Sequence, residues 1–297
     1  MKAFGVRDAA LAGVMVLIWG SNYAIAKLGL HQVPPFLFMA ARFALTAAML
    51  ACFVPVRRPP WLAIGVYASV VGLVHFGSIF YALRYTDAAT VIILSQVSVP
   101  LTAILGAGVL GEALTVRQGL GILVAVGGVA IAAGGPSLDV GLGIAAVIFL
   151  GALAWAVGTI WMKAKLSIPS SQVNLWVAVL AAPMLLIASV LTGEYPLKVM
   201  AELTPLSGIS ILYQAIFTVI IGYGIWNFLV SKYEVRLVSP ITLLVPPIGL
   251  LFAFVILGEA LSAYQAAGAA FTMIGVGLIV MPSTWLSRKS WGRREAT

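Results

Sequence analysis

Two ionisable side chains, Arg42 and His75, stand inside long apolar stretches of this 297-residue sequence. His75 could titrate near neutral pH and contact a small molecule, or it could be a hydrogen-bonded packing histidine. Arg42 could pair with helix-end carbonyls or with a carboxylate such as Asp87, attract the carboxylate of a substrate, or extend towards a membrane interface. For both residues, the alternatives differ in the groups that would surround the side chain.

The apolar stretches contain little else that could perform a reaction. They hold no nucleophile beside a base, no set of metal ligands and no paired carboxylates, so the sequence predicts neither an enzyme nor a metal or cofactor site. No Asp or Glu occupies the middle of an apolar stretch, which removes the usual proton-relay group of coupled transporters. If the chain transports a solute, the flux is therefore expected to follow the gradient of that solute or to be loosely coupled to protons.

A second group of side chains suits the binding of a small molecule with a charged and an aromatic part. It combines aromatic rings with amides and one imidazole, and amides in an apolar stretch need partners or water. For each member, packing between helices is the competing interpretation. We expect Asn22 and His75 to contact the charged part of such a molecule and the rings to contact its side chain. The candidate substrate-binding residues are Trp19, Asn22, Tyr23, His75, Gln96, Trp155, Tyr223, Trp226 and Asn227.

The elements that hold these residues are predicted to be membrane-spanning helices. Hydrophobic residues make up 62% of the chain, charged residues make up 9%, and the mean hydropathy is +1.10, which is more than a water-soluble fold can bury. The net charge of +8 is not gathered on a soluble basic face, so the bilayer and not a nucleic acid is the expected partner. The apolar runs predict an all-α polytopic membrane protein with ten transmembrane helices near 8–28, 35–55, 61–83, 88–110, 116–134, 141–162, 172–192, 207–230, 238–257 and 262–282.

A repeated motif divides the chain into two halves. The segment Gly111 to Thr115 (GEALT) recurs as Gly258 to Ser262 (GEALS). We predict a first half at 1–136, a second half at 137–284 and a basic tail at 285–297. Each half has five helices, an odd number, so the second half enters the membrane in the opposite sense and the repeat is inverted. Such halves enclose a site near the middle of the membrane and expose it to each side in turn.

The charged residues between the helices predict the orientation. Most of the 17 Lys and Arg residues fall on one side of the membrane, and short loops rich in these residues stay cytoplasmic. The sequence therefore predicts a multi-pass protein of the cell inner membrane with both termini cytoplasmic and with Glu112 and Glu259 on opposite sides. Residues 1–26 also have some features of a cleavable signal peptide, but the repeat requires this segment as its first helix.

Glycines and prolines in the helices near 88–134 and 238–282 suggest structural or gating roles, as does Arg42. Glycines seven residues apart share one helix face and allow a neighbouring helix to approach closely. Prolines interrupt backbone hydrogen bonds and could act as hinges. The glycines are Gly121, Gly128, Gly268 and Gly275, and the prolines are Pro100, Pro246 and Pro247.

Three groups of residues carry a resemblance to a known family: Trp19 to Tyr23 (WGSNY), Arg42 with Phe43, and the two Gly-Glu-Ala-Leu copies. With ten helices as five plus five, the chain resembles the drug/metabolite transporter superfamily of EamA type, and within it the YddG-like amino-acid exporters. The resemblance implies export of small metabolites, most of all aromatic and other neutral amino acids. Nucleosides, sugar derivatives or amphiphilic cations are the alternative cargo, and a structural membrane protein that transports nothing is the other alternative. The predicted seventh helix has no counterpart of Arg42, so the role of this residue need not be duplicated.

Overall fold

The computed structural model describes residues 5–111, 114–133, 141–233 and 238–280, and this part of the chain is helical without strands. Its first half contains α1 (Val6–Leu30), α2 (Pro35–Phe53), α3 (Trp61–Tyr67), the π-helical segment η1 (Ala68–His75), α4 (Phe76–Tyr85), α5 (Ala88–Ser95), α6 (Ser98–Leu110) and α7 (Val116–Ala133). The second half contains α8 (Leu142–Lys165), α9 (Ser170–Leu191), α10 (Pro196–Ala201), α11 (Pro205–Tyr213), the π-helical segment η2 (Gln214–Tyr223), α12 (Gly224–Lys232), the 3₁₀ segment η3 (Ser239–Leu244), α14 (Val245–Leu257) and α15 (Ala263–Val280).

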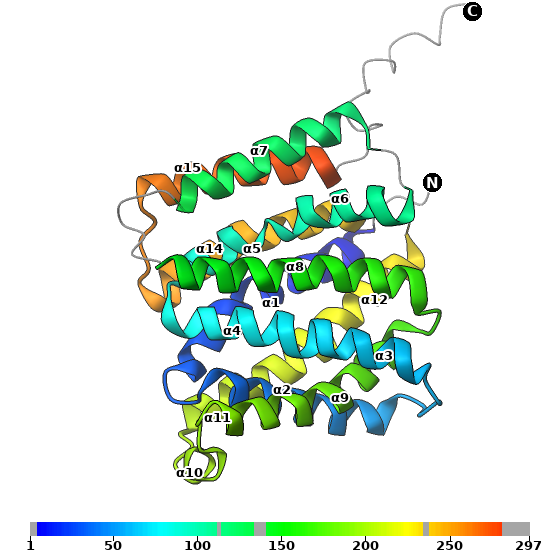
Figure 1. Cartoon of the computed structure of the whole chain (residues 1–297), viewed down its shortest axis with the longest axis vertical. Coiled ribbons are helices and arrows are strands. Elements are labelled where there is room, and N and C mark those ends of the chain that lie inside the picture. The colour runs from blue at the N-terminus through cyan, green and yellow to red at the C-terminus, as the bar shows by residue number, and fades with distance from the viewer. Residues whose placement is uncertain (1–4, 112–113, 134–140, 234–237, 281–297) are drawn as a thin grey trace, which may run out of the picture.

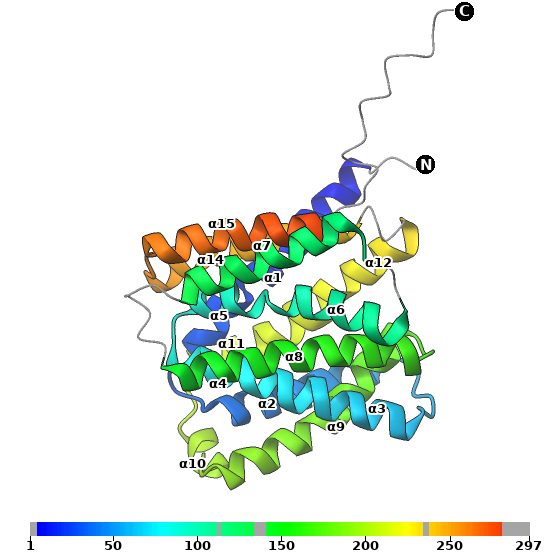
Figure 2. The same cartoon turned by 45° about the horizontal axis from the view of Figure 1, so that its top comes forward.

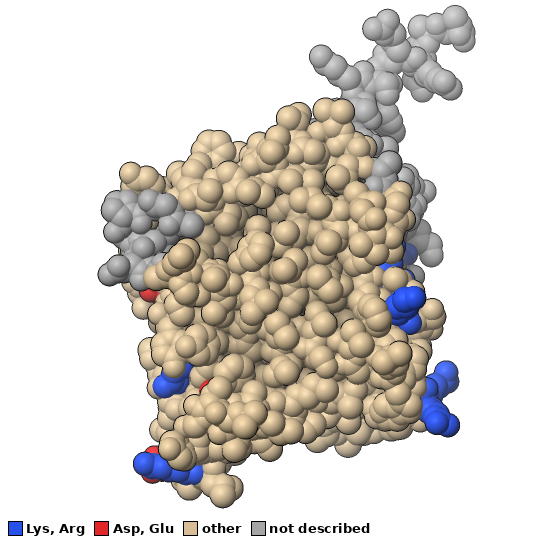
Figure 3. Space-filling model, in the orientation of Figure 1, with Lys and Arg blue, Asp and Glu red and all other residues tan. Residues whose placement is uncertain are grey.

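These elements form ten spans, which confirms the predicted class of polytopic helical membrane protein. Eight continuous stretches in the described residues are 18–25 residues long and apolar enough to cross a membrane, and Val116–Ala132 and Ile241–Leu257 are two shorter apolar helices. Several spans consist of consecutive elements. The span Trp61–Tyr85, for example, is made of α3, η1 and α4. On the face drawn in Figure 3, Lys, Arg, Asp and Glu lie at the left and right ends and an uncharged band lies between them, as the apolar interior of a bilayer requires.

The helices run side by side across the molecule, and α7 with α15 forms an outer pair (Figures 1 and 2). The glycine faces of this pair meet. A Cβ placed on Gly121 would lie 2.8 Å from the carbonyl oxygen of Gly275, and one on Gly268 would lie 2.6 Å from that of Gly128. Only glycine permits two helix backbones to approach so closely.

The repeated motif has the same local structure in both halves. Gly111 ends α6 with φ 68° and Gly258 ends α14 with φ 71°, a left-handed conformation that favours glycine. α6 ends at the right of Figure 1 and α14 at the left, as an inverted repeat requires. Glu112, the 136/137 boundary and the tail 285–297 lie outside the described residues, so the opposite placement of Glu112 and Glu259 and the division into halves stay predictions.

The next helix of each half then begins with the same cap. The backbone N–H of Thr115 donates to the Gln118 side chain and that of Gln118 donates to the Thr115 hydroxyl, at 3.0 and 3.3 Å. Ser262 and Gln265 exchange the corresponding pair of bonds at 2.9 and 3.2 Å. Such a reciprocal cap satisfies two of the free N–H groups at a helix start.

The prolines lie just after the interruptions of two spans. The span that begins with α5 is interrupted around Gln96, and Pro100 is the third residue of α6. In the corresponding span, η3 gives way to α14, whose first turn contains Pro246 and Pro247. A proline in the first turn of a helix removes an N–H that has no partner in the helix, so these prolines start the second piece of each span. Between the predicted spans 172–192 and 207–230, the connecting segment contains the short helix α10.

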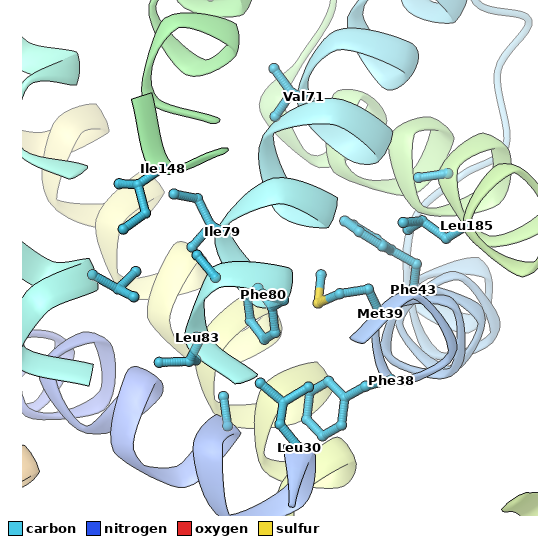
Figure 4. Packing of buried hydrophobic residues seen from close by; sticks show 14 of the residues in the cluster. Leu30, Phe38, Met39, Phe43, Val71, Ile79, Phe80, Leu83, Ile148 and Leu185 are labelled. Carbon is cyan, nitrogen blue, oxygen red and sulfur yellow. The ribbon is translucent and has the colours of Figure 1, made fainter. Parts of the chain in front are cut away.

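The core lies where α2 and α4 meet α8 and α9 (Figure 4). Phe38 and Phe80 stack with ring centres 5.9 Å apart, and Met39 lies beside them. All three side chains are buried, and burying a large apolar side chain stabilises a fold by about 1.5–3 kcal/mol in water. This core holds the first turns of α2 in place, just before Arg42 on the same helix.

Candidate functional site

A cavity of about 620 Å³ lies between the two halves. Its wall is formed by α2, α3, η1 and α4 from the first half and by α8, α9, η2 and α12 from the second, and its size is typical of small-molecule sites. The aromatic side chains on the wall are Phe43, Tyr67, Phe76, Trp155, Tyr223 and Trp226. The polar and charged ones are Arg42, Thr46, Thr159, Lys163, Ser170, Asn174 and Asn227.

The third span of each half contributes a π-helical segment to this wall. η1 carries Val71, and η2 carries Val219 and Tyr223, all of which line the cavity. π-Helical turns are rare and are frequently found at functional sites. Their wider turn changes which side chains share a face of the helix. The two halves thus place a π-helical segment at the same position, and both segments face the cavity.

Four of the predicted substrate-binding residues, Trp155, Tyr223, Trp226 and Asn227, line the cavity. Trp19 is not on the cavity wall but packs behind two residues that are, Tyr223 and Trp226. Its ring centre is 5.2 Å from that of Tyr223 and 5.9 Å from that of Trp226, and its Nε1 donates to the carbonyl of Thr218 at 3.3 Å. Trp19 therefore supports the aromatic wall and is not part of it.

His75 also lies behind the wall. Its Nδ1 is 2.9 Å from the carbonyl oxygen of Gly151, and its ring centre is 4.9 Å from that of Trp155. A carbonyl oxygen can only accept, so Nδ1 carries the proton in this bond. This is the geometry of a hydrogen-bonded packing histidine that orients the Trp155 ring, one of the two roles allowed by the sequence.

The remaining three candidates do not line the cavity. Asn22 joins α1 to η2, because its Oδ1 accepts from the Thr218 hydroxyl at 3.2 Å and its backbone carbonyl accepts from Gln214 at 2.9 Å. Tyr23 packs against the core, and Gln96 lies at the interruption between α5 and α6. The sequence identified polar residues at the right depth but not the direction in which each one points.

Arg42 lines the cavity without an anionic partner. Its guanidinium carbon is 4.8 Å from the ring centre of Phe76 and 5.7 Å from that of Phe80, and its Nη1 is 3.8 Å from the sulfur of Met39. Within the described part of the chain it has no ion pair with Asp87 or another carboxylate, and its Nε has no hydrogen-bond partner. Pairing with Asp87 and extension to an interface are therefore excluded in this conformation.

Glu259, which follows the end of α14, joins the two halves through Lys27 near the end of α1. Both helices end at the left of Figure 1. The Glu259 carboxylate accepts from Lys27 Nζ at 2.9 Å and from the backbone N–H groups of Ala88 and Ala89 at 3.0 Å each. Those N–H groups belong to the first turn of α5 and have no partner in the helix, so Glu259 caps α5 at the positive end of its dipole. Lys27 Nζ also donates to the carbonyl of Thr86 at 2.8 Å.

Two more contacts close the same end. Glu194 accepts from the backbone N–H groups of Phe36 and Leu37 at the start of α2, at 3.2 and 2.8 Å. Gln32 Oε1 accepts from the N–H of Thr204 at 2.9 Å, at the start of α11. Each contact joins a side chain of one half to a helix start of the other, and we refer to the contacts of Glu259, Glu194 and Gln32 as the polar seal.

The cavity reaches the opposite end of the bundle, where Leu166 and Ser170 at the α8–α9 turn belong to its wall. At that end α1 is joined to α12. Lys232 Nζ and the Tyr233 hydroxyl donate to the Asp8 carboxylate at 2.6 and 2.5 Å, and the hydrogen bond to Asp8 raises the pKa of Lys232. The cavity thus extends to the surface at the α8–α9 turn, while the polar seal joins the halves at the opposite end of the bundle.

Comparison with known proteins agrees with this architecture. Residues 9–134 and 142–281 match the EamA-like transporter family. The chain belongs to that family. This EamA-like protein is thus a multi-pass membrane transporter and not an enzyme.

Its relatives include a protein of Salmonella typhimurium described as a probable amino-acid metabolite efflux pump, 32% identical over 91% of this chain and 93% of that protein. A protein of Escherichia coli with the same description is 31% identical over 94% of this chain and 96% of its own length. A protein crystal structure shares the fold with a TM-score of 0.66 and 20% identity, and the match covers 95% of this chain and 98% of that one.

Proposed function

We propose that this EamA-like protein exports amino acids, aromatic and other neutral ones included, through the cavity between its halves. The observation that carries the proposal is the cavity itself, which both halves line and which extends to the surface at the end of the bundle opposite the polar seal. The description of the Salmonella and Escherichia relatives as amino-acid metabolite efflux pumps supports the cargo class.

The wall of the cavity suits an amino acid. A zwitterion that leaves water needs polar partners, and the wall offers Arg42, Thr46 and Asn227. A side chain such as that of phenylalanine packs well on Trp155 and Tyr223, since aromatic pairs contribute about 0.5–1.5 kcal/mol beyond the area they bury. One site can therefore accept both parts of the molecule.

The polar seal supports alternating access as the mechanism. Its bonds join side chains of one half to helix starts of the other, so they must break when the halves rock apart at that end. The interruption near Gln96 and the η3–α14 junction give the paired spans places to bend. In the predicted orientation, which places both termini in the cytoplasm, the open end of the cavity would face the cytoplasm, ready to load cargo for export.

Counterflow in proteoliposomes tests this function. Labelled phenylalanine, threonine and methionine should accumulate in vesicles preloaded with the same amino acid, and Trp155→Ala should slow phenylalanine because its ring forms part of the wall. Trp61→Ala is the matched control, since Trp61 is half exposed and packs on Trp176 away from the cavity. If nucleosides, sugar derivatives or amphiphilic cations move and no amino acid does, the proposed cargo is wrong.

A further inference from the structure

Two side chains on the cavity face of α2, one helical turn apart, each have a polar atom without a hydrogen-bond partner. Thr46 follows Arg42 by four residues, so the two side chains lie on the same side of the helix. Arg42 is 2% exposed and Thr46 is 1% exposed, and both line the cavity. Among the described residues, neither Arg42 Nε nor Thr46 Oγ1 has a hydrogen-bond partner.

Three buried helical hydroxyls among the described residues have no hydrogen-bond partner, those of Thr46, Ser189 and Thr272, and of these Thr46 is the one that lines the cavity. Other helical hydroxyls of the chain are satisfied locally. Those of Ser69, Thr102 and Thr159 each donate to the carbonyl four residues earlier, at 2.9, 2.7 and 2.8 Å. This local bond is the ordinary way to satisfy a hydroxyl on a helix in apolar surroundings. Because Thr46 lacks it and belongs to the cavity wall, its hydroxyl, although buried in this conformation, keeps a donor that no group of the described chain uses.

The charge of Arg42 is also uncompensated. The rings of Phe43, Phe76 and Phe80 lie 5.5, 4.8 and 5.7 Å from the guanidinium carbon, and their faces attract a cation without supplying a counter-charge. Of the described residues that line the cavity none is an Asp or Glu, and its second charged residue is Lys163. The electrostatic potential in the cavity therefore favours an anionic group and opposes a cationic ligand.

We propose that Arg42 and Thr46 together bind the carboxylate of the cargo. The proposal rests on the proposed function, in which the cavity is the transport site. The guanidinium presents paired N–H donors that match a carboxylate, and the Thr46 hydroxyl adds a further donor. Asn22 and His75, which the sequence suggested for the charged part of the cargo, already bond to Thr218 and Gly151. Recognition of the carboxylate selects acids and zwitterions over amides, amines and amphiphilic cations.

A pair of ligands tests the proposal on the unaltered protein. 3-Phenylpropionate and 3-phenylpropionamide have nearly the same shape, but only the first has a carboxylate. Binding to the purified protein is measured by intrinsic fluorescence, because Trp155 and Trp226 on the cavity wall report on a ligand there. The carboxylate should bind at least about tenfold more tightly than the amide, as expected for a hydrogen bond to a charged group. Equal affinities, or no binding of either ligand, would overturn the proposal.

Three variants then assign the preference to residues. Arg42→Gln should abolish it, and Thr46→Val, which keeps the shape of the side chain, should reduce it. Arg57→Gln should retain it, since Arg57 is exposed and outside the cavity. A preference that persists in folded Arg42→Gln protein would refute the assignment. If that variant does not fold, the ligand pair and Thr46→Val still decide.

The carboxylate site and the proposed function fail in different ways. If the protein prefers 3-phenylpropionate but shows no amino-acid counterflow, the amino-acid cargo is wrong and the carboxylate site stands. If phenylalanine undergoes counterflow but the two probes bind equally, the cargo stands and the carboxylate site is wrong.

Discussion

The substitution Glu259→Gln should open the sealed end of the cavity. The carboxylate holds Lys27 at 2.9 Å and the N–H groups of Ala88 and Ala89 at 3.0 Å. Glutamine keeps one acceptor oxygen and loses the charge, so the loss is roughly that of one hydrogen bond to a charged group, about 1.5–3 kcal/mol. Because about 1.4 kcal/mol corresponds to a factor of ten, the form open at this end should become about 10- to 150-fold more populated.

Cysteine labelling measures this change directly. The single cysteine, Cys52, is exposed and is first replaced by serine. A cysteine in place of Thr159 then reports on the cavity wall, and a membrane-impermeant maleimide is added from the sealed side. The labelling rate from that side should rise by the same factor of about 10–150 when Glu259→Gln is introduced.

The control is Glu202→Gln, which removes the same charge at the same end. Glu202 is exposed, and its contact with Gln32 uses its backbone carbonyl, which the substitution leaves in place. Labelling in this variant should match that of the parent. An unchanged rate in folded Glu259→Gln protein, or an equal rise in the control, would show that the carboxylate does not hold this end closed.

Three further outcomes follow from the packing and the repeat. Gly128→Leu should lower the yield of folded protein, because overpacking costs about 1–3 kcal/mol and two of the three nearest opposing atoms are backbone atoms of Thr272 and Gly268. Gly127→Leu faces open space and should fold normally, and equal yields would contradict the close packing of α7 on α15. Cysteines at Leu114 and Leu261 should be labelled from opposite sides of the membrane, and labelling from one side would refute the inverted repeat. His75→Ala should slow phenylalanine counterflow less than removal of the tryptophan ring that it supports, and an equal or larger effect would mean that the imidazole contacts the cargo.

Helix ends were the part of the fold that the sequence predicted best, because their signals are local. The apolar runs located the spans to within a few residues, since the bilayer requires a minimum length of apolar helix. The pair GEALT and GEALS marked two helix ends, and each glycine adopts the left-handed conformation that this position requires. Such constraints involve residues a few positions apart, so a single sequence contains them.

The direction of each side chain was harder to predict. Trp19 and His75 are at the right depth but lie behind Trp226 and Trp155, because helix rotation is decided by packing between distant segments. The π-helical segments add to the difficulty, since i→i+5 hydrogen bonding changes which residues share a face and the hydrophobic pattern does not signal it. Thr46 was missed for a third reason. Its hydroxyl matters because it lacks the usual local bond, which only coordinates can show.

The two halves share their helix ends but differ in the wall of the cavity. Helix caps and left-handed glycines meet needs of the backbone that are the same in both halves, so the repeat retains them. The Arg42 side chain meets no such need of the backbone, and it is not repeated: α9, the corresponding span of the second half, contains no Lys or Arg. An unpaired buried cation is costly in a membrane, so a single copy placed on a cavity wall is better explained by a ligand than by the fold. We therefore expect the repeated residues to hold the helix ends of the transporter together and the unrepeated residues of the cavity wall to determine what it carries.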